Sequence, residues 1–216
     1  MINKTTIFIV LAVLCLNFSA LAQAVRAKHL SPQKPIAAQA NLLPQFIPLK
    51  LGQKIPTAIY DQQFPILQTS DSTAESLGLS QYKGKLVLLD FWAAWCTSCI
   101  YKFEALEQLQ QTYADQLQVI LVNSKSTKDS KERMLGILSG KNAPYIKSNL
   151  ISIYNDTTLN KLFPHSYLPH YVWLGAKGEV LAYTGAVLVN KQTIQQLLAV
   201  IEKQHQKAQA ELKQKP

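Results

Sequence analysis

Apolar residues follow strand-like and helix-like spacings in turn from residue 86 onward. Residues 86–91 form a nearly continuous apolar run, and 117–122 form a second one. Such runs predict strands that are covered on both faces of a sheet. Between them, apolar residues recur every three or four positions, which indicates a helix with one apolar face. These residues are Ile100, Phe103, Leu106, Leu109 and Tyr113.

Three more helices are predicted in the second half of the chain. Residues 128–138 have a helical pattern. Asp156 or Thr157 can cap a short helix that runs to Phe163 and is stopped by the proline that follows. The last helix carries four apolar residues on one face, namely Ile194, Leu197, Leu198 and Ile201.

The remaining apolar segments predict hairpins. Tyr171–Leu174 and Val180–Thr184 flank the turn 176–178, which contains a glycine. Residues 47–85 predict a short extra hairpin and a connection. Strand, helix, strand and helix, followed by a hairpin and a helix, predict an α/β sandwich with a central mixed sheet.

The start of the chain predicts an exported protein. Lys4 is followed by an apolar run at 7–16 and by the small-x-small pattern Ala20-Leu21-Ala22. This order is typical of a signal peptide that is cleaved, here residues 1–22. The run is short for a bilayer span, so an uncleaved membrane anchor is the less favoured alternative. We therefore expect a periplasmic or otherwise extracytoplasmic location.

The rest of the chain divides by composition. Residues 23–45 are rich in Gln, Ala and Pro and predict a flexible tether. Residues 46–202 are long enough for one domain with its own core, and 203–216 predict a polar, basic tail. The formal net charge is +9, but the cations are scattered and no aromatic-rich basic stripe accompanies them. We therefore expect no nucleic-acid partner.

Only Cys96 and Cys99 remain after residues 1–22 are removed. A disulfide across two intervening residues closes almost no loop and adds little stability, so we interpret the pair as reactive. The pair lies where a buried strand ends and a helix begins. Unpaired N–H groups and the helix dipole favour a thiolate there. We expect Cys96 to be the nucleophile and Cys99, one turn further in, to resolve the mixed disulfide.

A metal site is an alternative use of the two cysteines. Zinc needs about four ligands, and the chain has no second cysteine pair. Of the four histidines, His29 and His205 lie far along the chain from the pair, whereas His165 and His170 flank one turn. A metal-binding chaperone that uses the cysteines and a histidine thus stays open, although we expect no bound metal and no cofactor beyond a redox-active disulfide.

The segment Leu88–Cys96 (LLDFWAAWC) resembles the active-site strand of thioredoxins. The turn Lys83-Gly84-Lys85 and the segment Leu51–Pro56 resemble the extracytoplasmic TlpA/ResA-like branch of that family. The resemblance covers roughly residues 50–202. It implies a thioredoxin-like three-layer α/β/α sandwich with a short N-terminal β extension. It also implies that Asp90 is a buried acid that exchanges a proton with Cys99, the alternative being a strand-end aspartate that faces solvent.

The same resemblance implies the substrate-binding residues. The peptide bond between Leu168 and Pro169 is expected to be cis, with the backbone of Leu168 pairing with an incoming peptide. His170 either lies near the sulfurs and stabilises the thiolate or is exposed at the start of a strand. Trp92 is expected to be packing. The full set of expected substrate contacts is Trp95, Thr97, Ser98, Leu168, Pro169 and His170.

Two features depart from the family pattern. The residues between the cysteines are Thr97 and Ser98, where cytosolic thioredoxins have Gly-Pro. Glu104 stands where the family usually has a helix-kinking proline, so we expect a straighter first helix.

The resemblance implies a reductase of disulfides in exported proteins, with apocytochrome c among its substrates and a membrane thiol carrier as electron donor. We expect a monomer. A dithiol oxidase with the same fold is the alternative, because about 30 mV corresponds to only 1.4 kcal/mol for a two-electron couple. A peroxidase is disfavoured, since Ala93-Ala94-Trp95 lacks the Pro and Thr that precede the attacking cysteine of peroxiredoxins.

Overall fold

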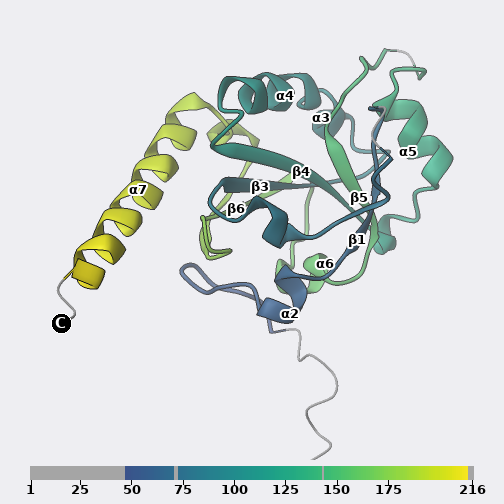
Figure 1. Cartoon of the computed structure of the whole chain (residues 1–216). Helices are drawn as coiled ribbons and strands as arrows, with labels where there is room; N and C mark the ends of the chain where they lie inside the picture. Colours follow the sequence, from purple (N-terminus) through teal and green to yellow (C-terminus); the bar gives the residue numbers. More distant parts are fainter. Residues whose placement is uncertain (1–46, 71–72, 143, 214–216) are drawn as a thin grey trace, which may run out of the picture. The chain divides into compact units, whose positions relative to one another are not determined.

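The computed structural model describes residues 47–70, 73–142 and 144–213 (Figure 1). The predicted signal peptide, 1–22, and tether, 23–45, lie outside these ranges. The chain divides into two units between residues 45 and 46, and the following description concerns the second unit only.

A seven-stranded mixed sheet, in the order β2-β1-β5-β4-β3-β6-β7, forms the centre of this unit (Figure 1). β3, β4 and β5 are parallel, while β1, β2, β6 and β7 pair antiparallel to their neighbours. The strands are β1 (Phe64–Leu67), β2 (Ser76–Leu77), β3 (Leu86–Trp92), β4 (Leu117–Ser124), β5 (Ile151–Asp156), β6 (His170–Leu174) and β7 (Val180–Thr184). The predicted mixed sheet and N-terminal β extension are confirmed, and β1 joins the sheet beside β5.

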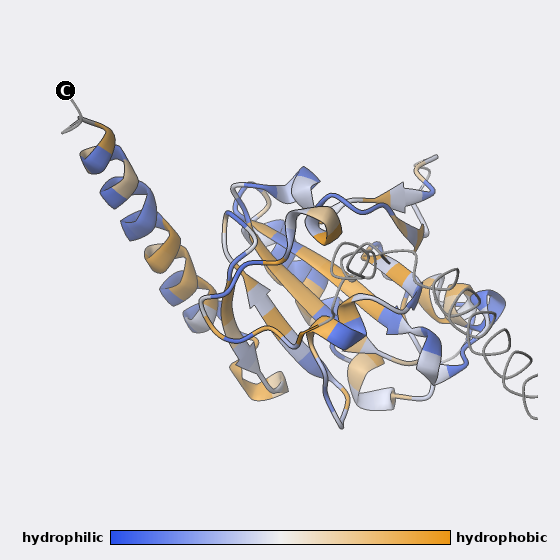
Figure 2. Ribbon diagram, turned by 90° about the horizontal axis from the view of Figure 1, so that it is seen from below, coloured by the Kyte–Doolittle hydropathy of each residue, from blue (hydrophilic) through white to orange (hydrophobic). Residues whose placement is uncertain are grey.

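Helices lie on both faces of the sheet, as a three-layer sandwich requires. They are α2 (Thr57–Tyr60), α3 (Thr97–Ile100), α4 (Phe103–Thr112), α5 (Lys131–Leu138), α6 (Leu159–Leu162) and α7 (Lys191–Lys213). Side chains alternate along β3, so that Leu88 and Trp92 pack with α3, α4, α5 and α7. Leu89 and Phe91 pack on the opposite face with α2 and α6. Figure 2 shows the resulting apolar central strands between more polar helices.

The hydrogen bonds at the helix ends explain two boundaries. α5 begins at Lys131, three residues later than predicted, because the Ser130 hydroxyl accepts a hydrogen bond from the Arg133 N–H (3.2 Å). Lys128, where the sequence predicted the helix to start, has a left-handed backbone with φ of 58°. The predicted cap at Asp156 is confirmed, since its carboxylate accepts the N–H groups of the three residues 158–160.

The prediction of a straighter first helix is wrong. α3 ends at Ile100 and α4 begins at Phe103, although no proline is present. The Lys102 N–H bonds to the Cys99 carbonyl, three residues back, at 3.0 Å. This tightened, 3₁₀-like turn interrupts the helix without a proline.

Two further features were not predicted. β5 supplies a third parallel strand beside β4, but its alternation of apolar and polar residues is too short to signal a strand. α7 continues through the predicted polar tail to Lys213. Ile194 and Ile201 in its first half are buried and anchor the helix to the core. Residues 202–212 are mostly exposed.

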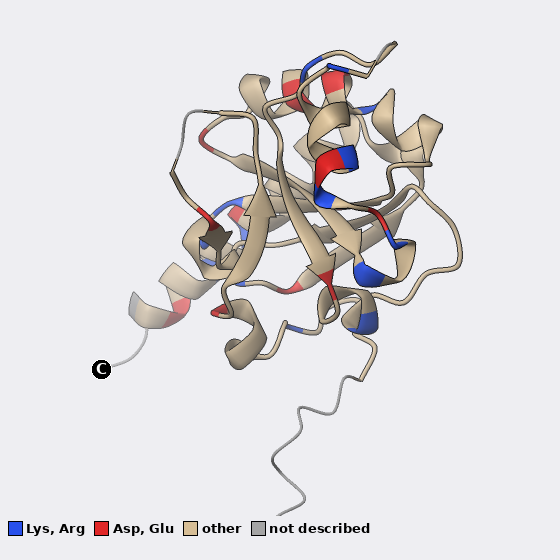
Figure 3. Ribbon diagram, turned by 90° about the vertical axis from the view of Figure 1, so that its right-hand side faces the viewer, with Lys and Arg blue, Asp and Glu red and all other residues tan. Residues whose placement is uncertain are grey.

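Within the described ranges, no helix combines the length and the apolar character that a bilayer span requires. Figure 3 shows Lys and Arg interspersed with Asp and Glu along the ribbon, with no continuous basic stripe on the side in view.

Candidate functional site

The two cysteines form a disulfide at the start of α3. Residues 93–95 connect the end of β3 to Cys96, which is the N-cap of α3 and whose carbonyl accepts the N–H of Cys99 at 3.0 Å. Cys99 is fully buried, whereas 5% of Cys96 is exposed, so Cys96 is the sulfur that an incoming disulfide can reach. The neighbouring Trp95 is 57% exposed and lies on the surface beside it.

The residues between the cysteines are both at the surface. The Ser98 hydroxyl lies 3.6 Å from the Cys96 sulfur. Because a hydroxyl can donate a hydrogen bond to an anionic sulfur, Ser98 is placed to stabilise the thiolate that forms when the disulfide is reduced. This gives Ser98 a role toward Cys96 itself, in addition to the predicted contact with substrate.

A partly buried carboxylate fixes the loop that precedes Cys96. Asp129 accepts hydrogen bonds from the Ala94 N–H (2.8 Å) and from the side-chain amide of Asn123 (2.8 Å). The Asn123 amide also reaches the Trp92 carbonyl at 3.3 Å, and Arg133 donates to the Ala94 carbonyl at 3.4 Å. This network is not predictable from the sequence, because its hydrogen-bonded partners are up to 39 residues apart in the chain.

Asp90 lies in β3, on the face of the sheet that the disulfide covers. It is completely buried, and neither carboxylate oxygen has a hydrogen-bond partner among the described residues. It points to the same face of β3 as Leu88 and Trp92, whose core cluster contains Cys99. Desolvation raises the pKa of Asp90 well above its usual value. The solvent-facing alternative is therefore wrong, and burial favours the protonated form of this acid, which lies on the same face of the sheet as Cys99.

Tyr171 faces the same buried space from the neighbouring strand. It pairs directly with Asp90 in the β3–β6 register, and its hydroxyl is buried without a hydrogen-bond partner in the described part of the chain. Desolvation, and then the charge of Asp90, raises the pKa of the Tyr171 phenol. The Asp90 carboxylate and the Tyr171 hydroxyl are thus two buried polar groups that lack hydrogen-bond partners within the described ranges and lie on neighbouring strands. From the sequence, Tyr171 was only an apolar strand residue.

The bond between Leu168 and Pro169 is cis, as predicted. Leu168 packs against both core clusters, one of which contains Cys96 and Cys99. That the backbone of this segment pairs with a bound peptide stays a prediction. The prediction that Trp92 is packing is also confirmed: it is buried, it contacts Phe103 edge-on, and its indole N–H donates to the Ser152 hydroxyl at 3.0 Å.

His170 does not serve the role predicted for it. Its side chain alternates to the face of β6 opposite Tyr171 and packs against the ring of Phe91, away from Asp90 and Cys99. Only 8% of the residue is exposed, so the alternative of an exposed histidine is also wrong. Desolvation, and then the charge of His165, lowers the pKa of His170 to about 4. A neutral ring on the far face cannot stabilise the thiolate by charge.

The histidines do not form a metal site either. The rings of His165 and His170 are stacked at 4.8 Å within an aromatic cluster. Among the residues that the structure describes, no three or more His, Cys, Asp or Glu side chains are grouped so that they could hold a metal ion. This finding is against the metal-binding chaperone.

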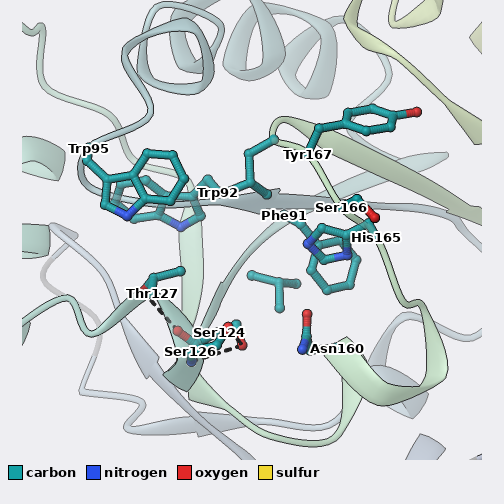
Figure 4. Close-up of a pocket in the computed structure, with 12 residues that line it drawn as sticks. Phe91, Trp92, Trp95, Ser124, Ser126, Thr127, Asn160, His165, Ser166 and Tyr167 are labelled. Atoms are coloured by element: carbon teal, nitrogen blue, oxygen red, sulfur yellow. Dashed lines mark hydrogen bonds between the residues drawn. The ribbon is translucent and has the colours of Figure 1, made fainter.

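A pocket of about 260 Å³ lies next to the side chain of Trp95 (Figure 4). Trp95, which precedes Cys96, and Leu168, which precedes the cis proline, both contribute to its lining. The pocket is therefore continuous with the surface that a substrate would cover.

Comparisons with known proteins agree with this geometry. The AhpC/TSA family model matches residues 60–138. A crystal structure of a protein proposed to be the thiol:disulfide interchange protein DsbE from Chlorobium tepidum has 25% identity and a TM-score of 0.52, covering 71% of this chain and 99% of that one. The chain has the thioredoxin-like fold.

Curated relatives of this thioredoxin-like protein point the same way. The thioredoxin-like protein YneN of Bacillus subtilis is 41% identical over 73 residues, which is 34% of this chain and 43% of that protein. The thiol:disulfide interchange protein HelX of Rhodobacter capsulatus is 30% identical over 95 residues, which is 43% of this chain and 51% of that protein. The matches thus span about half, or less, of the length of these two relatives.

Proposed function

We propose that the protein is a thiol–disulfide oxidoreductase that reduces disulfides of exported proteins through Cys96 and Cys99. The observation that carries the proposal is a slightly exposed cysteine at a helix start, disulfide-bonded to a buried one that has a buried acid of raised pKa on its own side of the sheet. The names DsbE and HelX, both of thiol:disulfide interchange proteins, support it.

The reaction follows from the unequal exposure of the two sulfurs. The Cys96 thiolate attacks one sulfur of the substrate disulfide, so that a mixed disulfide forms and the other substrate sulfur leaves as a thiolate that takes up a proton. Cys99 then gives up its proton and attacks the Cys96 sulfur. The Cys96–Cys99 disulfide forms, and the second substrate sulfur leaves as a thiol. Two electrons pass to the substrate.

Asp90 serves the second step. A thiol surrounded by apolar side chains resists ionisation, and the ionised form of Asp90 would be a base on the same side of the sheet. We assign to Asp90 the transfer of the Cys99 proton, through water if the two groups do not meet directly. No cofactor besides the disulfide is required for this reaction.

The location and partners belong to the same proposal. The predicted signal peptide and the kinship with interchange proteins support an extracytoplasmic site of action. That side of the membrane is oxidising, so a reductase there needs a supply of electrons, which we assign to a membrane thiol carrier. Apocytochrome c, whose haem is attached at a C-x-x-C-H motif, is one substrate of the expected kind.

The redox state of the pair in its own compartment tests the direction of electron flow. Thiol alkylation of intact cells should find Cys96 and Cys99 mostly reduced. The alkylated protein is separated on a gel, and a matched Cys96→Ser variant, which cannot form the disulfide, provides a reference for its migration. A pair that stays mostly oxidised would instead identify a dithiol oxidase.

A further inference from the structure

Aromatic rings and polar side chains both line the pocket next to Trp95 (Figure 4). The rings of Trp95 and of the Phe91–His165 pair, whose centroids are 4.7 Å apart, bound it on two sides. Polar side chains, including Ser126 and Asn160, line the side between them. A space between rings of this kind fits another flat aromatic group.

The lining lacks the four residue types that are charged at neutral pH. None of the residues that line the pocket is Lys, Arg, Asp or Glu. A charged group that entered would lose its hydration and find no opposite charge, which is unfavourable. The occupant is therefore neutral.

Two groups in the lining remain available for hydrogen bonds. The Nδ1 atom of His165 is paired with the Phe163 carbonyl at 2.9 Å, which leaves Nε2 for another partner. Asn160 is engaged through its backbone N–H with Asp156, while its carboxamide has no hydrogen-bond partner among the described residues. The hydroxyl of Ser126 is already paired with Ser124 at 2.9 Å. A polar tip on an aromatic ring would thus be bound by Asn160 and His165.

The position of the pocket indicates that its occupant is a side chain of the substrate polypeptide. Trp95 is adjacent to Cys96 in the chain, and Leu168 precedes the cis proline; the family resemblance implies that the backbone of Leu168 pairs with a bound peptide. A polypeptide whose disulfide reaches Cys96 thus brings its neighbouring side chains to the mouth of the pocket. This step rests on the proposed function.

We propose that the pocket binds an uncharged aromatic side chain, best tyrosine, that lies within a few residues of the attacked cysteine in the substrate. The site selects among disulfides by their sequence context. Full burial of such a ring corresponds to roughly tenfold or more in affinity.

Disulfide-bonded peptides test this proposal. The peptides differ in one residue near a cysteine. Tyr, Phe, Ala or Lys is placed in turn at each of the two positions on either side of it, and the rate at which the protein reduces each peptide is measured. We expect kcat/KM to fall in the order Tyr, Phe, Ala, Lys at one of these positions, with about a tenfold difference between Tyr and Ala.

A pocket-filling variant completes the test. Ser126 is exposed, so Ser126→Trp fills the mouth without disturbing the core and should remove the preference for Tyr over Ala, mainly through KM. Lys125→Trp, exposed in the same turn but not in the lining, is the matched control and should keep the preference. Equal rates for all peptides with the unaltered protein, or a preference that survives Ser126→Trp, would overturn the pocket assignment and leave the proposed function standing. Failure to reduce any peptide would refute the proposed function instead.

Discussion

Acid should destabilise this protein through His170. The ring is held between those of His165 at 4.8 Å and Tyr183 at 5.9 Å, and neither ring nitrogen has a hydrogen-bond partner within the described residues. Taking up a proton there places a charge in apolar surroundings beside a second histidine. These two effects, with desolvation the larger, lower the pKa of His170 from 6.5 to about 4.

The size and sign of the effect follow from proton linkage. Between about pH 6.5 and pH 4 the unfolded chain binds a proton at His170 and the folded protein does not. The free energy of unfolding therefore falls as the pH is lowered through this range, and the contribution is fully retained above pH 6.5. A shift from 6.5 to about 4 corresponds to about 3 kcal/mol. That is a large share of the 5–15 kcal/mol typical of a folded domain.

Urea unfolding at a series of pH values from 4 to 7.5 measures this contribution, with the disulfide kept oxidised. His170→Phe keeps a ring in the cluster but cannot titrate. Its free energy of unfolding, relative to that of the unaltered protein, should rise by about 3 kcal/mol as the pH falls from 6.5 to 4. His205→Phe, in α7, controls for the loss of a histidine as such. Parallel pH dependence in the unaltered protein and His170→Phe would refute the reasoning.

Three further substitutions test the buried groups around the disulfide. Asp90→Asn should stabilise the protein at neutral pH, because the raised pKa of Asp90 makes the free energy of unfolding fall as the pH rises above about 4. The same substitution should slow the release of trapped substrate. Urea unfolding and single-turnover kinetics measure these two effects, and unchanged stability would count against burial of the acid. Tyr171→Phe removes a dipole beside Asp90 and should shift the pH profile of disulfide reduction; an unmoved profile would argue that the two groups do not interact. Asp129→Ala should lower the free energy of unfolding by about 1–3 kcal/mol, since it leaves the Ala94 N–H unpaired, and should reduce kcat; intact stability in urea would contradict this.

The strand β3, the β6–β7 hairpin and the reactive pair were predictable because their signals are local. The apolar run at β3, followed at once by the two cysteines, carries both the strand and the helix start in consecutive residues. Asp90 was recognisable as the one acid inside that run. The hairpin of β6 and β7 was marked by its glycine turn, and Gly178 does have a positive φ of 74°.

What escaped prediction depends on contacts between distant parts of the chain. Asp129 matters only because the fold brings its carboxylate to Ala94, 35 residues earlier. Tyr171 matters only because of its register opposite Asp90. Neither alternative for His170 holds, because its position directly after Pro169 does not say which side of β6 its side chain occupies. Side-chain alternation along the strand, once the register is known, settles that point.

The division of labour between the two sulfurs is tested most directly by trapping substrates. Each of the variants Cys99→Ser and Cys96→Ser is expressed in cells, free thiols are blocked with acid and alkylating agent, and disulfide-linked adducts are separated without reductant. Cys99→Ser should accumulate mixed disulfides through Cys96, because nothing is left to resolve them, and Cys96→Ser should accumulate none. Adducts on Cys96→Ser with none on Cys99→Ser would contradict the account.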